Sequence, residues 1–116
     1  MTNQIDYFEI GSPEPEASKA FYHNLFGWQI GEPSAPAGYS DIDSGRGGLW
    51  DTTALGGANW AIFYVNVPDV RAAAESARQL GATIAIPPTD NGNIEFAHLI
   101  DPQGNRFGVW RPKPSS

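Results

Sequence analysis

The chain has 116 residues, the size of one small domain, and its hydrophobic content of 41% is enough to build a core. Its 13 acidic residues outnumber 7 basic ones, and a net charge of −6 argues against binding to nucleic acid or anionic membranes. Because the chain has no Cys, it has no disulfide, no thiolate nucleophile and no thiolate metal site.

The first half of the chain predicts one helix and four strands. An apolar stretch over residues 5–10 predicts the first strand. Ser12 is a candidate N-cap for a helix that ends at Gly27. A four-residue spacing predicts one apolar face on this helix, formed by Ala17, Phe21 and Leu25. Three more strands are predicted over residues 28–30, 39–43 and 48–51.

The second half repeats this order of elements. A strand is predicted over residues 60–67, and Asp69 is the candidate N-cap of a helix that ends at Gly81. Three strands follow, over residues 83–86, 94–100 and 106–110. The segments GGLW and FGVW end the two halves, which indicates an internal repeat. We therefore predict one domain over 1–116, made of two modules over about 4–51 and 60–111 with a linker over 52–59.

Three separated segments carry a family resemblance: FEIGSPEPEASKAFYHNLFGW, YVNVPDVRAAAESARQLGA and IDPQGNRFGVW. They resemble the vicinal oxygen chelate superfamily, which includes glyoxalase I, extradiol dioxygenases and the bleomycin-resistance proteins. The resemblance implies an α+β fold in which two βαβββ modules form a cupped, eight-stranded mixed sheet with helices on its convex face. It also implies a homodimer.

The metal-dependent members of this superfamily hold a divalent ion through His, Gln or Glu at four sheet positions. The resemblance places these positions at Tyr7, Gly48, Ile62 and Gly108, none of which is an ordinary ligand for such an ion. We therefore predict no metal site and no cofactor. The alternative is a divalent metal held by other side chains, such as Glu9 and His98. The two glycines are expected to leave room above the sheet.

Glu9 is the candidate catalytic residue. Because strand residues alternate in direction, Phe8 and Ile10 would pack on the helices while Glu9 faces the concave side. Its carboxylate could act there as a general base or hold a cationic group. It could instead be a buried side chain tied to the backbone or to Tyr hydroxyls.

Aromatic residues are expected on the same side of the sheet as Glu9. Rings with polar tips suit a flat organic ligand or a cation held over a ring face, although they could also form the core or a dimer seam. His98 could face either the cleft or the helix layer. The predicted ligand-binding residues are Tyr7, Glu9, Trp50, Trp60, Tyr64, His98 and Trp110.

These features predict a metal-free protein of the bleomycin-resistance type, which binds a small aromatic or cationic organic molecule in an acidic, aromatic-lined cleft. The alternative is an enzyme, either a glyoxalase-like lyase or isomerase or a dioxygenase, that uses a divalent metal or Glu9 as general base. A third hypothesis is a domain that pairs with a larger protein. The chain lacks a signal peptide and a run of about 18 apolar residues, so we expect a cytoplasmic protein.

Overall fold

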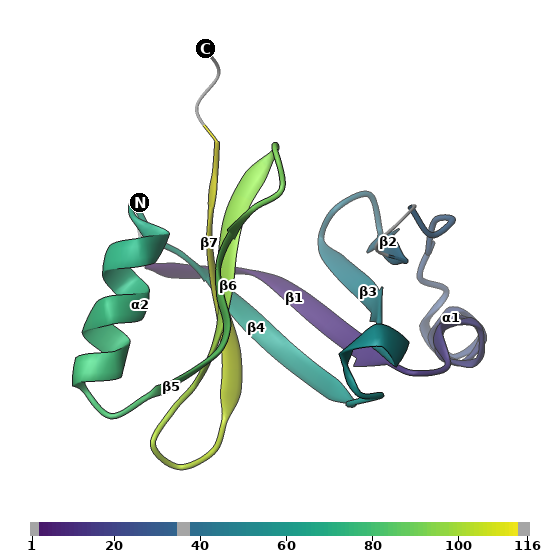
Figure 1. Cartoon of the computed structure of the whole chain (residues 1–116). Coiled ribbons are helices and arrows are strands. Elements are labelled where there is room, and N and C mark those ends of the chain that lie inside the picture. Colours follow the sequence, from purple (N-terminus) through teal and green to yellow (C-terminus); the bar gives the residue numbers. More distant parts are fainter. Residues whose placement is uncertain (1–2, 35–37, 114–116) are drawn as a thin grey trace. The chain divides into compact units, whose positions relative to one another are not determined.

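A computed structural model describes residues 3–34 and 38–113. Within these ranges the chain forms two α-helices, seven strands and one short 3-10 helix, which confirms the α+β class (Figure 1). The chain divides into two compact units. We call residues 7–62 the first unit, and residues before 7 together with those after 62 the second unit.

The first unit contains a mixed sheet and one helix. β1 (Gln4–Ser12) pairs in parallel with β3 (Gly47–Asp51), and β2 (Tyr39–Ile42) pairs with β3 in the antiparallel sense. α1 (Pro15–Phe26) follows β1, and the 3-10 helix η1 (Thr53–Leu55) follows β3. The register sets Glu9 opposite Gly48 and Gly48 opposite Asp41, so these three residues share one face of the sheet.

The core of the first unit lies on the other face of this sheet. Buried Ile10, Ile42 and Leu49 form it, with Tyr22 of α1 packed against them. The ring of Tyr22 stacks on Trp28, with 5.4 Å between the ring centroids. Phe21 and Leu25, by contrast, are 59% and 58% exposed. The predicted apolar face of this helix is therefore wrong, because Tyr22, one position further round the helix, is the residue that packs inward.

Two local predictions in the first unit are also wrong. Ser12 is not the N-cap of α1, which is Glu14; the Ser12 hydroxyl instead accepts the Glu14 N–H at 3.0 Å. Residues 28–30 form no strand, because only Ile30 makes a bridge, to Ile42. The chain stays beside β2 after Ile30, since the Gly31 N–H donates to the Asp41 carbonyl at 2.9 Å and Ser34 bridges to Tyr39, but these isolated bridges do not join into a ladder. Among the described residues the fold thus has seven strands rather than eight.

The second unit contains one helix and four further strands. Its elements are β4 (Trp60–Asn66), α2 (Val70–Gln79), β5 (Thr83–Asp90), β6 (Ile94–Ile100) and β7 (Arg106–Pro112). β4 begins in the first unit and pairs in parallel with β7, while β7, β6 and β5 are antiparallel neighbours. Two register shifts interrupt β5, one between Ile84 and Ile86 and one between Ile86 and Thr89 that includes Pro87 and Pro88, which an edge strand tolerates.

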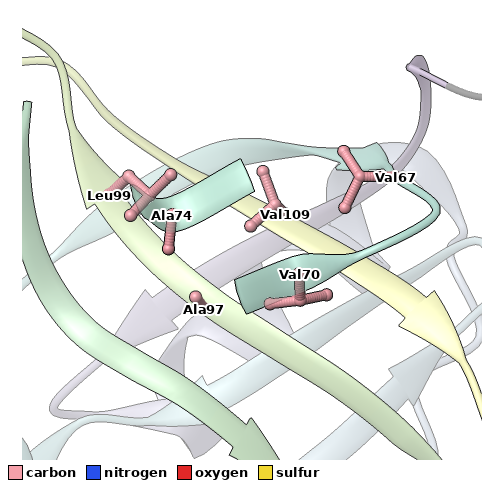
Figure 2. Packing of buried hydrophobic residues seen from close by; sticks show 6 residues of the cluster. All are labelled: Val67, Val70, Ala74, Ala97, Leu99 and Val109. Atoms are coloured by element: carbon pink, nitrogen blue, oxygen red, sulfur yellow. The ribbon is translucent and has the colours of Figure 1, made fainter. Parts of the chain in front are cut away.

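Helix α2 packs on one face of this sheet (Figure 2). Val70 and Ala74 of α2 contact the buried side chains of Ala97, Leu99 and Val109 on β6 and β7. The predicted cap at the start of α2 is confirmed, because the Asp69 carboxylate accepts the Ala72 N–H at 3.0 Å. Over the described part of the chain, neither helix has the length and apolar character needed to cross a membrane.

Candidate functional site

Glu9 lies on the face of the first unit that is turned away from α1, and only 2% of its surface is exposed. The Tyr39 hydroxyl donates to its Oε1 at 3.1 Å, and the Trp60 indole N–H donates to its Oε2 at 2.9 Å. The Tyr7 hydroxyl lies 2.8 Å from that of Tyr39. Since Tyr39 gives its hydrogen to Glu9, Tyr7 is the donor to Tyr39. The bonds therefore run in one direction, from Tyr7 through Tyr39 to the carboxylate.

The electrostatics of this face keep Tyr7 protonated. The pKa of the Tyr7 hydroxyl is raised from 10.0 to about 12, chiefly by burial, with the hydrogen bond to Tyr39 lowering it and the negative charges of Glu9 and Asp41 raising it. Tyr7 thus remains a neutral donor at physiological pH.

Aromatic rings surround the Glu9 carboxylate. Tyr39 and Trp50 meet edge to face with centroids 6.0 Å apart, and Trp50 and Trp60 do so at 5.9 Å. All three rings are half-buried and Asp41, on the same face, is exposed. We call the side chains of Tyr7, Tyr39, Trp50 and Trp60 the aromatic face. Ring faces backed by carboxylates suit a flat cation.

Tyrosine rings fill the space above Gly48 and Gly108. A Cβ added to Gly48 would collide with the Tyr39 side chain, and one added to Gly108 in the second unit would collide with the Tyr64 ring. The expectation that these glycines leave room above the sheet is therefore wrong. The missing side chain is what allows a ring on a neighbouring strand to lie over the backbone.

His98 and Tyr64 form a second polar group, inside the second unit. They are 0% and 4% exposed, and the Tyr64 hydroxyl lies 2.6 Å from Nε2 of His98. Arg106 Nη1 lies 3.0 Å from His98 Nδ1. A guanidinium only donates, so Nδ1 accepts, and in the neutral ring Nε2–H donates to the Tyr64 oxygen. Because Ala97 and Leu99 on either side pack under α2, His98 faces away from that helix.

The predicted site residues thus fall into separate groups. Tyr7, Glu9, Trp50 and Trp60 come together in the first unit, and Tyr64 meets His98 in the second. The Trp110 indole N–H donates to Asp6 at 2.9 Å within the second unit. Sequence reasoning missed Tyr39 and Arg106, which carry the contacts to Glu9 and His98. The alternation of Tyr39 with Ser40 in a predicted strand was the available signal for the first of them.

The four positions that the resemblance gives to metal ligands do not fit a divalent ion. Gly48 and Gly108 offer no donor atom and lie under tyrosine rings, Ile62 is apolar, and Tyr7 is a neutral phenol. Over residues 3–34 and 38–113, no three His, Asp or Glu side chains gather in a group that could hold a metal ion.

An open pocket of about 330 Å³ lies beside α1 in the first unit. Its lining is mixed, with apolar carbon atoms, hydroxyls and an amide, and no sequence pattern predicted it. The residues are Ile10, Gly11, Ser12, Ser18, Tyr22, Asn59, Trp60 and Ala61. Only Trp60 is shared with the aromatic face.

Known proteins resemble this chain in sequence. The model of the glyoxalase-like domain family matches residues 7–110. The "Putative glyoxylase CFP32" of Mycobacterium tuberculosis is 29% identical over 119 residues, which cover 97% of this chain and 46% of that protein. The "Anthracycline biosynthesis protein DauV" of Streptomyces sp. is 29% identical over 128 residues, which cover 90% of this chain and 46% of that protein. The chain therefore spans less than half the length of these relatives.

Solved structures resemble it in fold. Methylmalonyl-CoA epimerase of Streptomyces coelicolor gives a TM-score of 0.65 at 18% identity, over 98% of this chain and 100% of the epimerase. The Mn(II)-bound glyoxalase of Novosphingobium aromaticivorans gives 0.61 at 15% identity, over 93% of this chain and 37% of that one. At these identities the likeness is one of fold alone.

Proposed function

The chain belongs to the glyoxalase-like domain family of the vicinal oxygen chelate superfamily, and on this premise we propose that it is a metal-independent binding protein for a small organic molecule. The ligand is an aromatic or cationic compound that lies on the aromatic face of the first unit. No cofactor takes part. The protein acts in the cytoplasm as a homodimer, and sedimentation equilibrium would then give twice the 12.5 kDa of one chain.

The hydrogen bonding of Glu9 is the observation that carries this proposal. Each carboxylate oxygen accepts a bond from a neutral donor, which stabilises a negative charge beneath the rings. That charge adds to the negative potential of the ring faces, and exposed Asp41 adds a second charge on the same side. The net charge of −6 further favours the approach of a cation.

Quenching of tryptophan fluorescence tests the proposal. We expect N-methylacridinium, a flat cation, to quench Trp50 and Trp60 in a saturable way, and neutral acridine of nearly the same shape to bind more weakly. The Asp41→Asn variant should weaken binding of the cation by up to about fivefold, because an exposed charge contributes at most ~1 kcal/mol. Leu80→Ser, at an exposed position of the second unit, is the matched control and should bind as the native chain does.

The variants Glu9→Gln and Trp60→Ala address the buried part of the site. We expect both to weaken binding more than Asp41→Asn does, because they remove the central charge or one of the rings above it. Circular dichroism checks that each variant is folded. If both folded variants bind the cation as tightly as the native chain, the proposal is wrong.

A glyoxalase-like enzyme is the second candidate function. It is favoured by the directed hydrogen-bond chain from Tyr7 to Glu9, which ends on a carboxylate able to act as general base. Lyase, isomerase and dioxygenase assays, each with and without added divalent metal, separate the two candidates. Turnover that Glu9→Gln abolishes would favour the enzyme, whereas saturable quenching without turnover would favour the binding protein.

A further inference from the structure

The turn between β5 and β6 contains the one Asn–Gly pair of the sequence, Asn91 and Gly92. It lies at the tip of an exposed hairpin of the second unit (Figure 1). The backbone at Gly92 has φ +95°, a conformation that glycine adopts at no steric cost. Neither the family nor the aromatic face accounts for this turn.

Two hydrogen bonds hold the side-chain amide of Asn91, and a third holds the backbone N–H that follows it. Its Oδ1 accepts the backbone N–H of Asn93 at 3.0 Å and that of Ile94 at 2.9 Å. The N–H of Gly92, the next residue along the chain, donates to Oδ1 of Asp90 at 2.8 Å. Residues 90–94 thus contain a side-chain carbonyl whose oxygen accepts two N–H groups. The backbone N–H directly after it donates to a carboxylate.

Lys113 holds Asp90 in its charged form. The Lys113 ammonium contacts Asp90 Oδ2, and this bond, together with the Gly92 N–H, keeps the pKa of Asp90 below its usual range. The backbone N–H of Lys113 also donates to the Asn93 carbonyl at 3.0 Å. The end of β7 therefore fixes the carboxylate that faces Gly92.

This arrangement supplies what cyclisation of asparagine needs. The backbone nitrogen must lose its proton as it attacks the side-chain carbonyl carbon, and a carboxylate on the N–H can take that proton. The carbonyl oxygen gains negative charge during the attack, and two backbone donors stabilise it. Glycine has no Cβ to hinder the approach of its nitrogen.

We propose that Asn91 is a site of self-modification. The Gly92 nitrogen forms a bond to Cγ of Asn91, the Cγ–Nδ2 bond breaks, and the proton from Gly92 passes through Asp90 to the departing ammonia. The product is a five-membered succinimide. Water then opens this ring at either carbonyl, which leaves aspartate or isoaspartate at position 91. No oxidant or reductant is needed.

The modification changes the charge and the shape of the hairpin tip. A new carboxylate appears beside Asp90, where the N–H groups of Asn93 and Ile94 can bind it. Isoaspartate also adds one methylene group to the backbone path between β5 and β6. Modified and native chains are therefore separable by charge.

Peptide mapping by mass spectrometry of the full chain tests this proposal. The protein is incubated at neutral pH, and a synthetic peptide of residues 88–95 is incubated under the same conditions as a reference for the rate of conversion. We expect Asn91 to show the mass gain of amide-to-acid conversion, with isoaspartate among the products, while the other six Asn residues stay unchanged. An unmodified Asn91 at the time when the peptide is fully converted would overturn the proposal.

The Asp90→Asn variant tests the carboxylate, since it keeps the shape of the side chain and removes its charge. We expect conversion of Asn91 to slow on the order of tenfold or more. Glu32→Gln, which removes a charge in the first unit, is the matched control and should convert at the native rate. Circular dichroism checks both folds. An equal rate in a folded Asp90→Asn chain would overturn the part given to Asp90.

Discussion

Glycines under aromatic rings recur in the strands of both units. A Cβ at any of these glycines would collide with a ring, so each ring approaches the backbone this closely only because the glycine has no side chain. The pairs are Gly11 with Trp60, Gly47 with Phe8, Gly48 with Tyr39, and Gly108 with Tyr64. Three of the four rings belong to residues that also make the polar contacts of the candidate site.

The Gly108 pair gives a prediction at the scale of single residues. Replacing Gly108 by Ala should lower the free energy of unfolding by about 1–3 kcal/mol, because the methyl group overpacks the Tyr64 ring. The double variant Gly108→Ala, Tyr64→Ala should lose less stability than the sum of the losses in the two single variants, since the collision is gone. Urea unfolding of the four chains measures this coupling, and strict additivity would contradict it.

Tyr7 gives a second prediction, on stability against pH. Its pKa is about 12 in the folded chain and near 10 in the unfolded one, so between these values the folded state binds more protons. The stabilising contribution of Tyr7 is thus complete below pH 10 and is lost as the pH rises from about 10 to 12. The absorbance of tyrosinate should show a late ionisation that the Tyr7→Phe variant removes. A titration in which all four tyrosines ionise together would contradict this.

Predictions for single residues are confirmed where the alternation of side chains along a strand is enough to place them. Alternation places Glu9 opposite to Phe8 and Ile10, and the structure has that arrangement. The alternative of a buried Glu tied to Tyr hydroxyls also matches, through Tyr39. Alternation with Ser40 marks Tyr39 as a residue of one sheet face, but its approach to Glu9 depends on the registers of two strand pairs, which periodicity does not specify.

At the scale of elements, the two helices differ in how well their sequences specify a face. α2 carries small residues and a capping Asp69; Val70 and Ala74 are buried, with Ala73 and Ala77 packed beside them, whereas Leu80, which shares their spacing, is 80% exposed. α1 has large apolar residues around much of its circumference, and no residue of it is fully buried. Spacing alone could not choose between Phe21 and Tyr22, because the stacking partner Trp28 lies beyond the end of the helix.

The orientation of α1 leads to a matched pair of substitutions. Phe21→Ala should change the free energy of unfolding by less than about 0.5 kcal/mol, since that side chain is exposed. Tyr22→Ala should cost about 2–4 kcal/mol, because it removes a ring that packs on Trp28 and on the core of the first unit. Thermal unfolding at low protein concentration compares them. A larger loss for Phe21→Ala would mean that the helix is turned the other way.

At the scale of the whole molecule, β1 is hydrogen-bonded through Asp6 to residues much later in the chain. Asp6, in the first half of β1, accepts the Trp110 indole N–H at 2.9 Å and the Asn66 side-chain amide at 3.1 Å. The first bond joins positions 104 residues apart in the sequence, and the second joins positions 60 residues apart. The repeat of two modules is visible in the sequence, but this exchange of β1 residues into the second unit is not, because no local pattern marks it.

The Asp6 contacts predict a long-range effect of a substitution near the N-terminus. Asp6→Ala should speed amide hydrogen exchange in β7 around Trp110, since the carboxylate that bonds the indole is lost, with a cost of about 1 kcal/mol. Asp6→Asn keeps one acceptor and should have a smaller effect. Hydrogen exchange measured by mass spectrometry tests both, and unchanged protection of β7 in Asp6→Ala would contradict the prediction.

The tyrosine rings over Gly48 and Gly108 constrain the routes by which such a chain can change its chemistry over evolutionary time. A carboxylate introduced first at position 108 meets the ring of Tyr64, whereas loss of that ring first leaves a hole beside buried His98. Each single step should destabilise the fold more than the two substitutions made together, so the two substitutions depend on one another. A laboratory search for a metal-binding descendant of this chain therefore has to mutate the glycine and its tyrosine together.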